Sequence, residues 1–164
     1  MENRVQMQET DRFIKELGKQ FGDLGNRFGE LSEQLVISGV EERFNELGFK
    51  FRGIITGGLT IKDEAKKIKA EIDILLENDD YIIAVEVKSR PGLNDIEHHI
   101  RRLEILCEHR RKKNDGRKIM GAIAGAVFGA AEKKAALEAG LYVLEQSGDT
   151  MKIDVPESFV PREW

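Results

Sequence analysis

The sequence contains a single cysteine, Cys107, and it lacks any long apolar run. One cysteine excludes an intrachain disulfide and argues against a cysteine-based zinc site. The longest weakly polar stretch, residues 120–131, is rich in Gly and Ala and is shorter than the ~20 residues that a membrane span needs. The first residues also lack the basic and then apolar pattern of a secretory leader. We therefore expect a cytoplasmic protein in a reducing environment, with no membrane partner.

Apolar residues are scarce as well, at 40% of the 164 residues, while charged residues reach 34%. This balance predicts a small core with a large solvated surface. The net charge of −4 argues against a protein that binds nucleic acid by bulk charge. The charge is unevenly distributed, because residues 88–118 carry ten basic and five acidic side chains. That segment fits either a local contact with a polyanion or a solvated helix face.

The first 35 residues follow a heptad pattern. Its positions recur at alternating steps of three and four: Met7, Thr10, Ile14, Leu17, Phe21, Leu24, Phe28, Leu31 and Leu35. This is the a/d seam of a coiled coil, and it predicts a helix over residues 1–35 that pairs two subunits into a homodimer. Glycines interrupt the pattern at up to ~1 kcal/mol each, so an isolated helix would fray. A helix that folds back on its own domain is the alternative.

A second pattern begins near residue 36, where the apolar stripe changes phase. Its members are Ile37, Val40, Phe44 and Leu47, and Gly48 then provides a helix stop. The change predicts a second domain over residues 36–164, with its first helix beginning near residue 29.

Strand and helix patterns alternate through this second domain. We expect strands at 49–55, 71–76 and 81–87, a helix at 94–113, a strand at 118–127, a helix at 131–139, and strands at 141–145 and 151–155. This order predicts an α/β fold in which helices flank a mixed β-sheet.

The second and third predicted strands carry polar residues where apolar ones are expected. Asp73 interrupts the first of them, and Glu86 and Lys88 lie on the next. Because side chains alternate along a strand, Glu86 and Lys88 share one face, whereas Val85 and Val87 point to the other. Buried carboxylates need compensation, and Mg²⁺ with its preference for oxygen ligands is a natural partner. An ion pair on a solvated sheet face is the alternative.

The sequence Ile72-Asp73, followed after twelve residues by Glu86-Val87-Lys88, resembles the signature of the PD-(D/E)xK nuclease superfamily. The similarity is greatest to archaeal Holliday-junction resolvases and to uncharacterised prokaryotic relatives, and it covers about residues 29–145. Ile72 stands where the superfamily name has proline, a frequent variation. The resemblance implies a restriction-endonuclease-like fold, preceded in this chain by the coiled-coil helix.

The resemblance also implies an acidic residue on the first helix. Glu33 lies near the centre of the apolar stripe at 100° per residue, whereas Glu30 and Glu41 are rotated away from it. The segment from Gly29 to Glu33 is also similar to the resolvase helix. Glu33 is therefore the preferred candidate, and Glu30 and Glu41 stay as alternatives.

A metal-dependent DNA endonuclease is the function that the resemblance implies. Asp73 and Glu86, with the Val87 carbonyl, would hold Mg²⁺ or Mn²⁺, Lys88 would assist the attacking water, and Glu33 would contribute directly or through water. The basic residues expected to contact DNA phosphates are Arg101, Arg102, Arg110, Arg111, Lys112 and Lys113. The alternatives are a catalytically silent DNA-binding or scaffolding protein with the same fold, and a coiled-coil adaptor.

Several other residues receive structural interpretations. Cys107 lies on the inward stripe of the helix at 94–113 and is expected to pack in the core. His98 and His99 lie beside that stripe and are interpreted as surface residues, although one of them is a candidate phosphate contact. His109 is also expected at the surface. Gly121, Gly125 and Gly129 lack the Lys-Ser/Thr of a nucleotide loop and indicate close packing instead.

Overall fold

The computed structural model describes residues 2–164, except for the side chains of residues 24–33. The chain divides into two units, with the boundary between Leu35 and Val36. Helix α1, Glu2–Glu46, includes residues on both sides of this boundary. The heptad pattern of the sequence ends at the same position.

The first unit consists of the part of α1 up to Leu35. The predicted helix is therefore confirmed, while its pairing with a second copy stays a prediction. Three described seam residues, Met7, Ile14 and Phe21, are more than half exposed. The seam positions Leu24, Phe28 and Leu31 fall outside the residues whose side chains are described. Among the described helices, none has a stretch both long enough and apolar enough to cross a bilayer.

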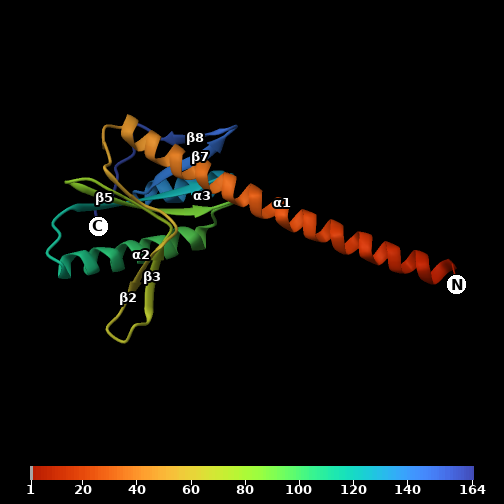
Figure 1. Ribbon diagram of the computed structural model, residues 1–164. Coiled ribbons are helices and arrows are strands. Elements are labelled where there is room, and N and C mark those ends of the chain that lie inside the picture. Colours follow the sequence, from red (N-terminus) through yellow and green to blue (C-terminus); the bar gives the residue numbers. More distant parts are fainter. Residues whose placement is uncertain (1) are drawn as a thin grey trace. The chain divides into compact units, whose positions relative to one another are not determined.

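The second unit is a mixed α/β domain, and Figure 1 labels most of its elements. After α1 these are β1 Gly53–Ile55, β2 Leu59–Lys62, β3 Ile68–Ile72, β4 Ile74–Glu77, β5 Tyr81–Lys88, α2 Leu93–Lys112, β6 Lys118–Gly125, α3 Ala130–Glu138, β7 Tyr142–Ser147 and β8 Thr150–Asp154. The main sheet has the order β1-β4-β5-β6-β7-β8, and β2 and β3 form a separate two-stranded sheet. Strands β5, β6 and β7 are parallel, and the outer pairs are antiparallel. The predicted fold class, a mixed sheet flanked by helices after a long N-terminal helix, is confirmed.

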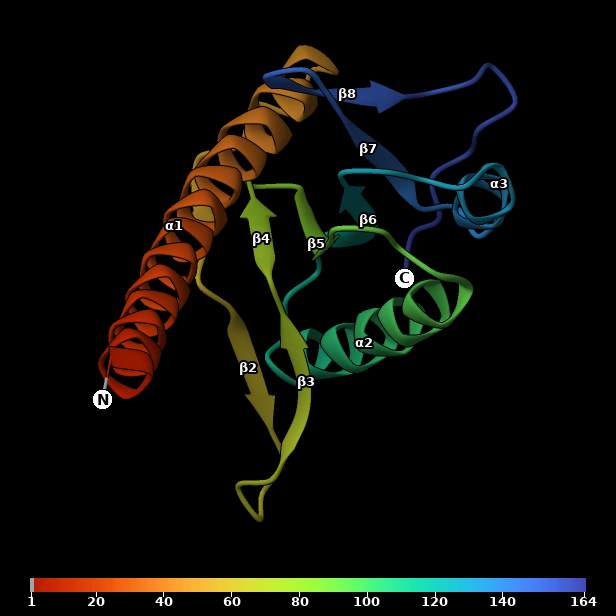
Figure 2. The same ribbon diagram turned by 90° about the vertical axis from the view of Figure 1, so that its right-hand side faces the viewer.

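The prediction of three strands between α1 and α2 is wrong, because the structure has five. Strands β1 to β4 form one long hairpin with a bend. At its base Ile55 lies opposite Leu75, and at its tip side Leu59 lies opposite Ile72. Between these pairs, the three residues 56–58 face only two residues, 73 and 74, so the hairpin contains one extra residue. Figure 2 shows β2 and β3 continuing away from the main sheet.

Two glycines produce this bend. Gly57 and Gly58 have φ angles of +77° and +93°, a region that glycine adopts without the steric cost of a Cβ atom. In the sequence the same pair resembles a turn that closes a strand, because both situations require positive φ. An extra residue in one strand bends the pair and redirects nearby side chains, and such bulges often occur beside functional sites.

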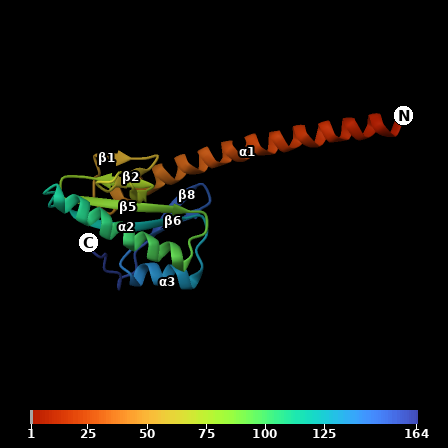
Figure 3. The same ribbon diagram turned by 90° about the horizontal axis from the view of Figure 1, so that it is seen from below.

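Apolar side chains form one layer on each face of the sheet. The first layer joins α2 and α3 to the sheet through residues such as Ile96, Leu103 and Ala136, which pack with Ile82 and Ala84 of β5. Figure 3 shows α2 and α3 on the same side of the strands. The second layer holds Val40 and Phe44 of α1, together with Ile83, Val85 and Met120. Complete burial of a side chain such as Phe44 contributes about 1.5–3 kcal/mol to folding.

An ion-pair cluster around Arg117 ties the turn after β4 to the loop before β6. Arg117 Nη2 lies 2.8 Å from Asp115 Oδ2, and its Nη1 donates to Glu77 Oε2 and to the Asn78 carbonyl, both at 3.2 Å. These bonds hold the pKa of Asp115 down at about 2, chiefly through the hydrogen bonds from the Arg117 side chain. The cluster lies at the end of the sheet where β5 and β6 begin.

Candidate active site

Asp73 lies at the bend of the hairpin, between the end of β3 and the start of β4. Its half-buried carboxylate accepts a hydrogen bond from the backbone N–H of Val87 through Oδ2, at 2.8 Å. Ile74 pairs with Val85 in the β4–β5 ladder, so the same register extended by one residue places Asp73 beside Glu86. The bend therefore positions Asp73 against the C-terminal half of β5.

Glu86 is buried in β5, with only 4% of its surface exposed. Its Oε2 lies 2.7 Å from Nη1 of Arg102, which projects from the middle of α2. Burial raises the pKa of the Glu86 carboxyl above its usual value, and the nearby charge of Asp73 raises it further. The Arg102 guanidinium acts in the opposite direction. Burial and the like charge of Asp73 thus disfavour the charged form of Glu86, whereas Arg102 stabilises it.

Lys88 lies two residues beyond Glu86, at the end of β5, and its side chain is about half exposed. Its Nζ lies 3.9 Å from Asp95 Oδ1 in the first turn of α2. The other Asp95 oxygen, Oδ2, accepts the N–H of Gly92 at 2.8 Å, so Asp95 also caps the helix. The predicted alternation along β5 is confirmed for Val85 and Val87, which belong to the opposite apolar layer.

The described residues include the oxygen donors of the predicted cation site, Asp73, Glu86 and the Val87 carbonyl. Within this part of the chain, no group of three or more His, Cys, Asp or Glu side chains is arranged to hold a metal ion. The predicted set contains two carboxylates and one backbone carbonyl, all of them the hard oxygen ligands that Mg²⁺ prefers. The buried Glu86 already holds a cationic group, Arg102, at hydrogen-bond distance. The donor chemistry therefore fits one divalent cation that completes its coordination with water or phosphate oxygens.

The predicted helix carboxylate cannot be assigned from the described side chains. Glu33 and its alternative Glu30 fall among residues 24–33, which lie outside them. Glu41, the other alternative, lies in the part of α1 that belongs to the second unit and is half-buried. The role of Glu33 stays a prediction.

The six basic residues predicted to contact DNA differ in their surroundings. Arg101, Arg111, Lys112 and Lys113 are exposed on α2 or directly after it. Arg102 is instead directed to Glu86, and Arg110 lies 3.8 Å from Asp115 with only 18% of its side chain exposed. The structure therefore leaves four of the six available at the surface and places Arg102 beside the carboxylates.

The interpretation of His99 as a surface residue is wrong, because the side chain is completely buried. Its Nε2 lies 3.0 Å from the Ala84 carbonyl of β5, and its buried Nδ1 has no partner among the described residues. Burial lowers the pKa of His99 to about 4, so the ring is neutral at pH 7. The signal was present in the sequence: Ile96, His99, Leu103 and Leu106 have helical spacing, and all four are buried. His98, in contrast, is exposed.

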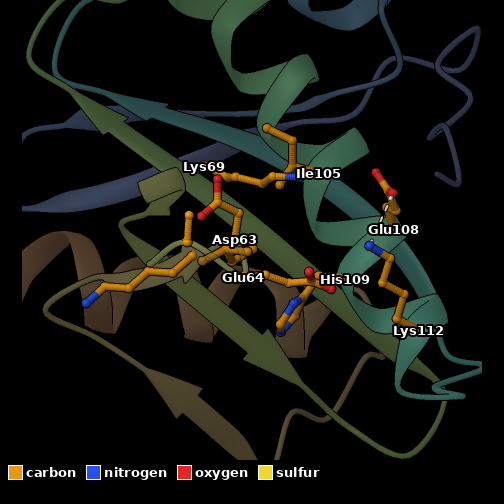
Figure 4. A pocket seen from close by; sticks show the side chains of 10 residues that line it. Asp63, Glu64, Lys69, Ile105, Glu108, His109 and Lys112 are labelled. Atoms are coloured by element: carbon orange, nitrogen blue, oxygen red, sulfur yellow. Dashed lines mark ion pairs between the residues drawn. The ribbon is translucent and has the colours of Figure 1, made fainter. Parts of the chain in front are cut away.

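A cavity of about 510 Å³ lies between the tip of the bent hairpin and α2. Figure 4 shows it with carboxylates and basic groups on both sides. Its walls include Asp63, Glu64, Lys69, Ile105, Glu108, His109 and Lys112. His109, expected at the surface, is half-buried here, and burial followed by the neighbouring cations Lys113 and Arg110 lowers its pKa. The cavity is lined by none of Asp73, Glu86 and Lys88, so it is separate from the carboxylate site.

The packing interpretations of Cys107 and of the glycines of β6 are supported. Cys107 is half-buried and packs against the layer between α2 and the sheet. A Cβ atom on Gly121 would collide with Leu103 and Leu141, and one on Gly125 would meet Pro91 and Phe128. These glycines allow the close approach of neighbouring elements to β6.

No protein-family model and no curated protein matches the sequence. Two solved structures are similar to parts of it. One is a complex of EndoMS with double-stranded DNA, at 20% sequence identity and a TM-score of 0.39, covering 65% of this chain and 44% of that chain. The other is R.BspD6I2, the small subunit of the heterodimeric restriction endonuclease R.BspD6I, at 16% identity and a TM-score of 0.37, covering 76% of this chain and 72% of that one. This chain thus spans less than half the length of the EndoMS chain that it matches.

Proposed function

We propose that this protein is a metal-dependent endonuclease of the PD-(D/E)xK type that hydrolyses phosphodiester bonds in DNA. The observation that carries the proposal is the position of Asp73 at the hairpin bend, beside the buried Glu86 and bonded to the backbone of β5. The order of elements from α1 through the antiparallel strands, α2 and β6 supports it, because this is the order that the resemblance to the superfamily implies.

In this proposal each site residue has a separate task. Asp73 and Glu86, with the Val87 carbonyl, hold Mg²⁺ or Mn²⁺. When bound, the ion supplies Lewis acidity at the scissile phosphate and lowers the pKa of bound water. Lys88, at the exposed end of β5, orients the attacking water, accepts its proton when neutral and offsets phosphate charge when protonated. Glu33 is the proposed additional carboxylate of this site.

DNA binding is proposed to rest on the exposed basic residues of α2. Arg101, Arg111, Lys112 and Lys113 are exposed, and in this proposal they contact backbone phosphates, which position the duplex without selecting a sequence. We propose further that residues 1–35 pair two copies of the chain. A dimer brings two cleavage sites into one particle, which suits cutting of both strands or of branched DNA.

A second candidate function is DNA binding without cleavage. The observation that favours it is the Arg102–Glu86 ion pair, which satisfies the buried carboxylate without a metal ion. The two candidates differ in one measurable property, because only the nuclease requires a divalent cation at Asp73 and Glu86.

Cleavage of a panel of linear and branched DNA substrates with Mg²⁺ or Mn²⁺ tests the proposal. We expect cutting by the wild type, and none after chelation or in the Asp73→Asn and Lys88→Gln variants. Glu71→Gln is the matched control, because Glu71 is exposed on β3 two residues before Asp73. Binding of DNA by a wild type that cleaves no substrate would favour the second candidate. Cleavage that survives Asp73→Asn would place the active site elsewhere.

A further inference from the structure

Arg102 binds Glu86, the buried member of the carboxylate pair Asp73 and Glu86, whereas the other basic residues proposed to contact DNA from α2 are exposed. Its guanidinium makes a charge-assisted hydrogen bond to Glu86 at 2.7 Å, and its side chain is 30% exposed against 5% for Glu86. It lies on α2 one turn after His99, which is completely buried against the same strand. Arg102 therefore approaches Glu86 from the partly solvated side of the site.

Arg102 compensates the buried charge of Glu86 through a direct hydrogen bond, and the charge of Lys88 adds a smaller favourable effect. A buried carboxylate without a partner is costly, and a second negative group increases that cost: Asp73, which is bonded to the Val87 N–H and lies beside Glu86 in the β4–β5 register. Arg102 is the charged group that meets this demand at hydrogen-bond distance. A divalent cation bound by Asp73 and Glu86 would meet the same demand with twice the charge.

We propose that Arg102 is a positioning residue that occupies the place of a divalent cation at Glu86, and that the metal ion must displace its guanidinium to bind. The inference rests on the proposed metal-dependent function and extends it to a residue outside the motif. Both groups are cations that use the same carboxylate, and a guanidinium left at 2.7 Å would repel an incoming metal ion. Because Arg102 is partly exposed, it has a path from Glu86 towards solvent that does not require α2 to move.

This exchange makes a quantitative prediction about metal affinity. Removing Arg102 removes both the competitor and its repulsion, so metal binds more tightly. Because the hydrogen bond that must break is charge-assisted, we expect at least about a tenfold decrease in the dissociation constant, the equivalent of ~1.4 kcal/mol. An Arg102 that served only to stabilise the fold would leave the affinity of the folded protein unchanged.

The experiment titrates Mn²⁺ into the full chain without DNA, by calorimetry and by the electron paramagnetic resonance signal of free Mn²⁺. Arg102→Gln is expected to bind about tenfold more tightly than the wild type, and Arg102→Lys to fall between them. Lys134→Gln is the matched control, since it removes the same charge from an exposed helix position outside the proposed sites, and we expect less than a twofold change. Unchanged or weaker binding by Arg102→Gln would overturn the proposal.

Two further measurements keep the test decisive. If Arg102→Gln fails to fold, the Nε–H resonance of Arg102 in the wild type replaces it: we expect this resonance to shift and its hydrogen exchange to accelerate when Mg²⁺ is added. A resonance that does not change at saturating Mg²⁺ contradicts the displacement. Wild-type binding that is lost in Asp73→Asn but unaffected by Arg102→Gln rejects the exchange alone, whereas no Mn²⁺ binding by any variant rejects the metal-dependent function and the exchange together.

Discussion

The carboxylate of Asp73 accepts the backbone N–H of Val87 at 2.8 Å and so fixes the bend of the hairpin to β5. In the proposed function the same carboxylate also binds the cation. Two substitutions distinguish the hydrogen bond to Val87 from the proposed binding of the cation. An asparagine keeps an oxygen acceptor for Val87, whereas an alanine leaves the half-buried N–H without a partner.

We expect Asp73→Asn and Asp73→Ala both to abolish cleavage, but to affect folding differently. Losing the acceptor costs about 1–3 kcal/mol, so Asp73→Ala should unfold at lower urea concentration. Asp73→Asn removes a charge that repels Glu86, and we expect its metal-free stability to equal or exceed that of the wild type. Urea denaturation with chelator provides the measurement, and equal destabilisation by both variants would contradict the assigned hydrogen bond.

His99 should make stability decrease in mild acid. Its pKa is lowered to about 4 in the folded protein, whereas an unfolded histidine titrates near 6.5. The unfolded state therefore binds more protons between these values, and stability is lost as the pH falls through that range. At pH 5 the expected loss is about 2 kcal/mol relative to pH 7. His99→Gln keeps a side-chain donor but cannot titrate, so the difference in unfolding free energy between pH 7 and pH 5 should shrink by that amount.

Asp115 should contribute stability that disappears only in stronger acid. Arg117 lowers the pKa of Asp115 to about 2 from an ordinary 3.8, so its contribution is complete above pH 4 and is lost as the pH falls towards 2. We expect Asp115→Asn to cost about 1–2 kcal/mol at pH 7, allowing for solvent screening of the pair. The cost should decrease at pH 3, as measured by urea denaturation at both values. A cost independent of pH would indicate lost packing instead of lost charge.

The exposed end of α2 should control the salt dependence of DNA binding. We expect the triple substitution Arg111→Ser, Lys112→Ser and Lys113→Ser to weaken binding to all duplexes alike. It should reduce the slope of log affinity against log salt concentration by about 0.9 for each phosphate that the protein no longer neutralises. Arg110 is left intact because it pairs with Asp115. Fluorescence anisotropy across a salt series gives the slope, and an unchanged slope would identify this segment as a solvated helix end.

The seam of α1 should set the oligomeric state. Ile14 and Phe21 occupy seam positions and are exposed in the single chain, and burial of such side chains against a partner contributes about 1.5–3 kcal/mol each. We expect a dimer for the wild type and a monomer for Ile14→Asp with Phe21→Asp, by light scattering at micromolar concentration. Lys15→Asp with Lys19→Asp is the control for added acidic charge outside the seam. A monomeric wild type would reject pairing through this helix.

Local sequence patterns predict most of the helices and strands of the second unit, but they do not predict the contacts between residues on different elements. The helix expected at 94–113 is observed at Leu93–Lys112, and the alternation along β5 follows from strand geometry. The sequence at Gly57 and Gly58 indicates a turn where the structure has a bend, since positive φ serves both. The contact between Arg102 and Glu86 joins residues sixteen positions apart and depends on how α2 crosses the sheet, which spacing along either element does not determine.

The bend also divides the hairpin into two parts. In one part the strand register must be kept, and in the other the length and sequence can vary. On one side of the bend, the pairing of β1 with β4 sets the register of Asp73. On the other side β2 and β3 form an arm, and its residues Ile61 and Ala70 pack in the same apolar layer as α2. Residues 63–67, which connect β2 to β3, belong neither to the β1–β4 pairing nor to the β2–β3 ladder. This end of the hairpin is therefore suited to grafting: an arm lengthened there by matched pairs of residues, or exchanged for one of other specificity, would leave the two carboxylates in register.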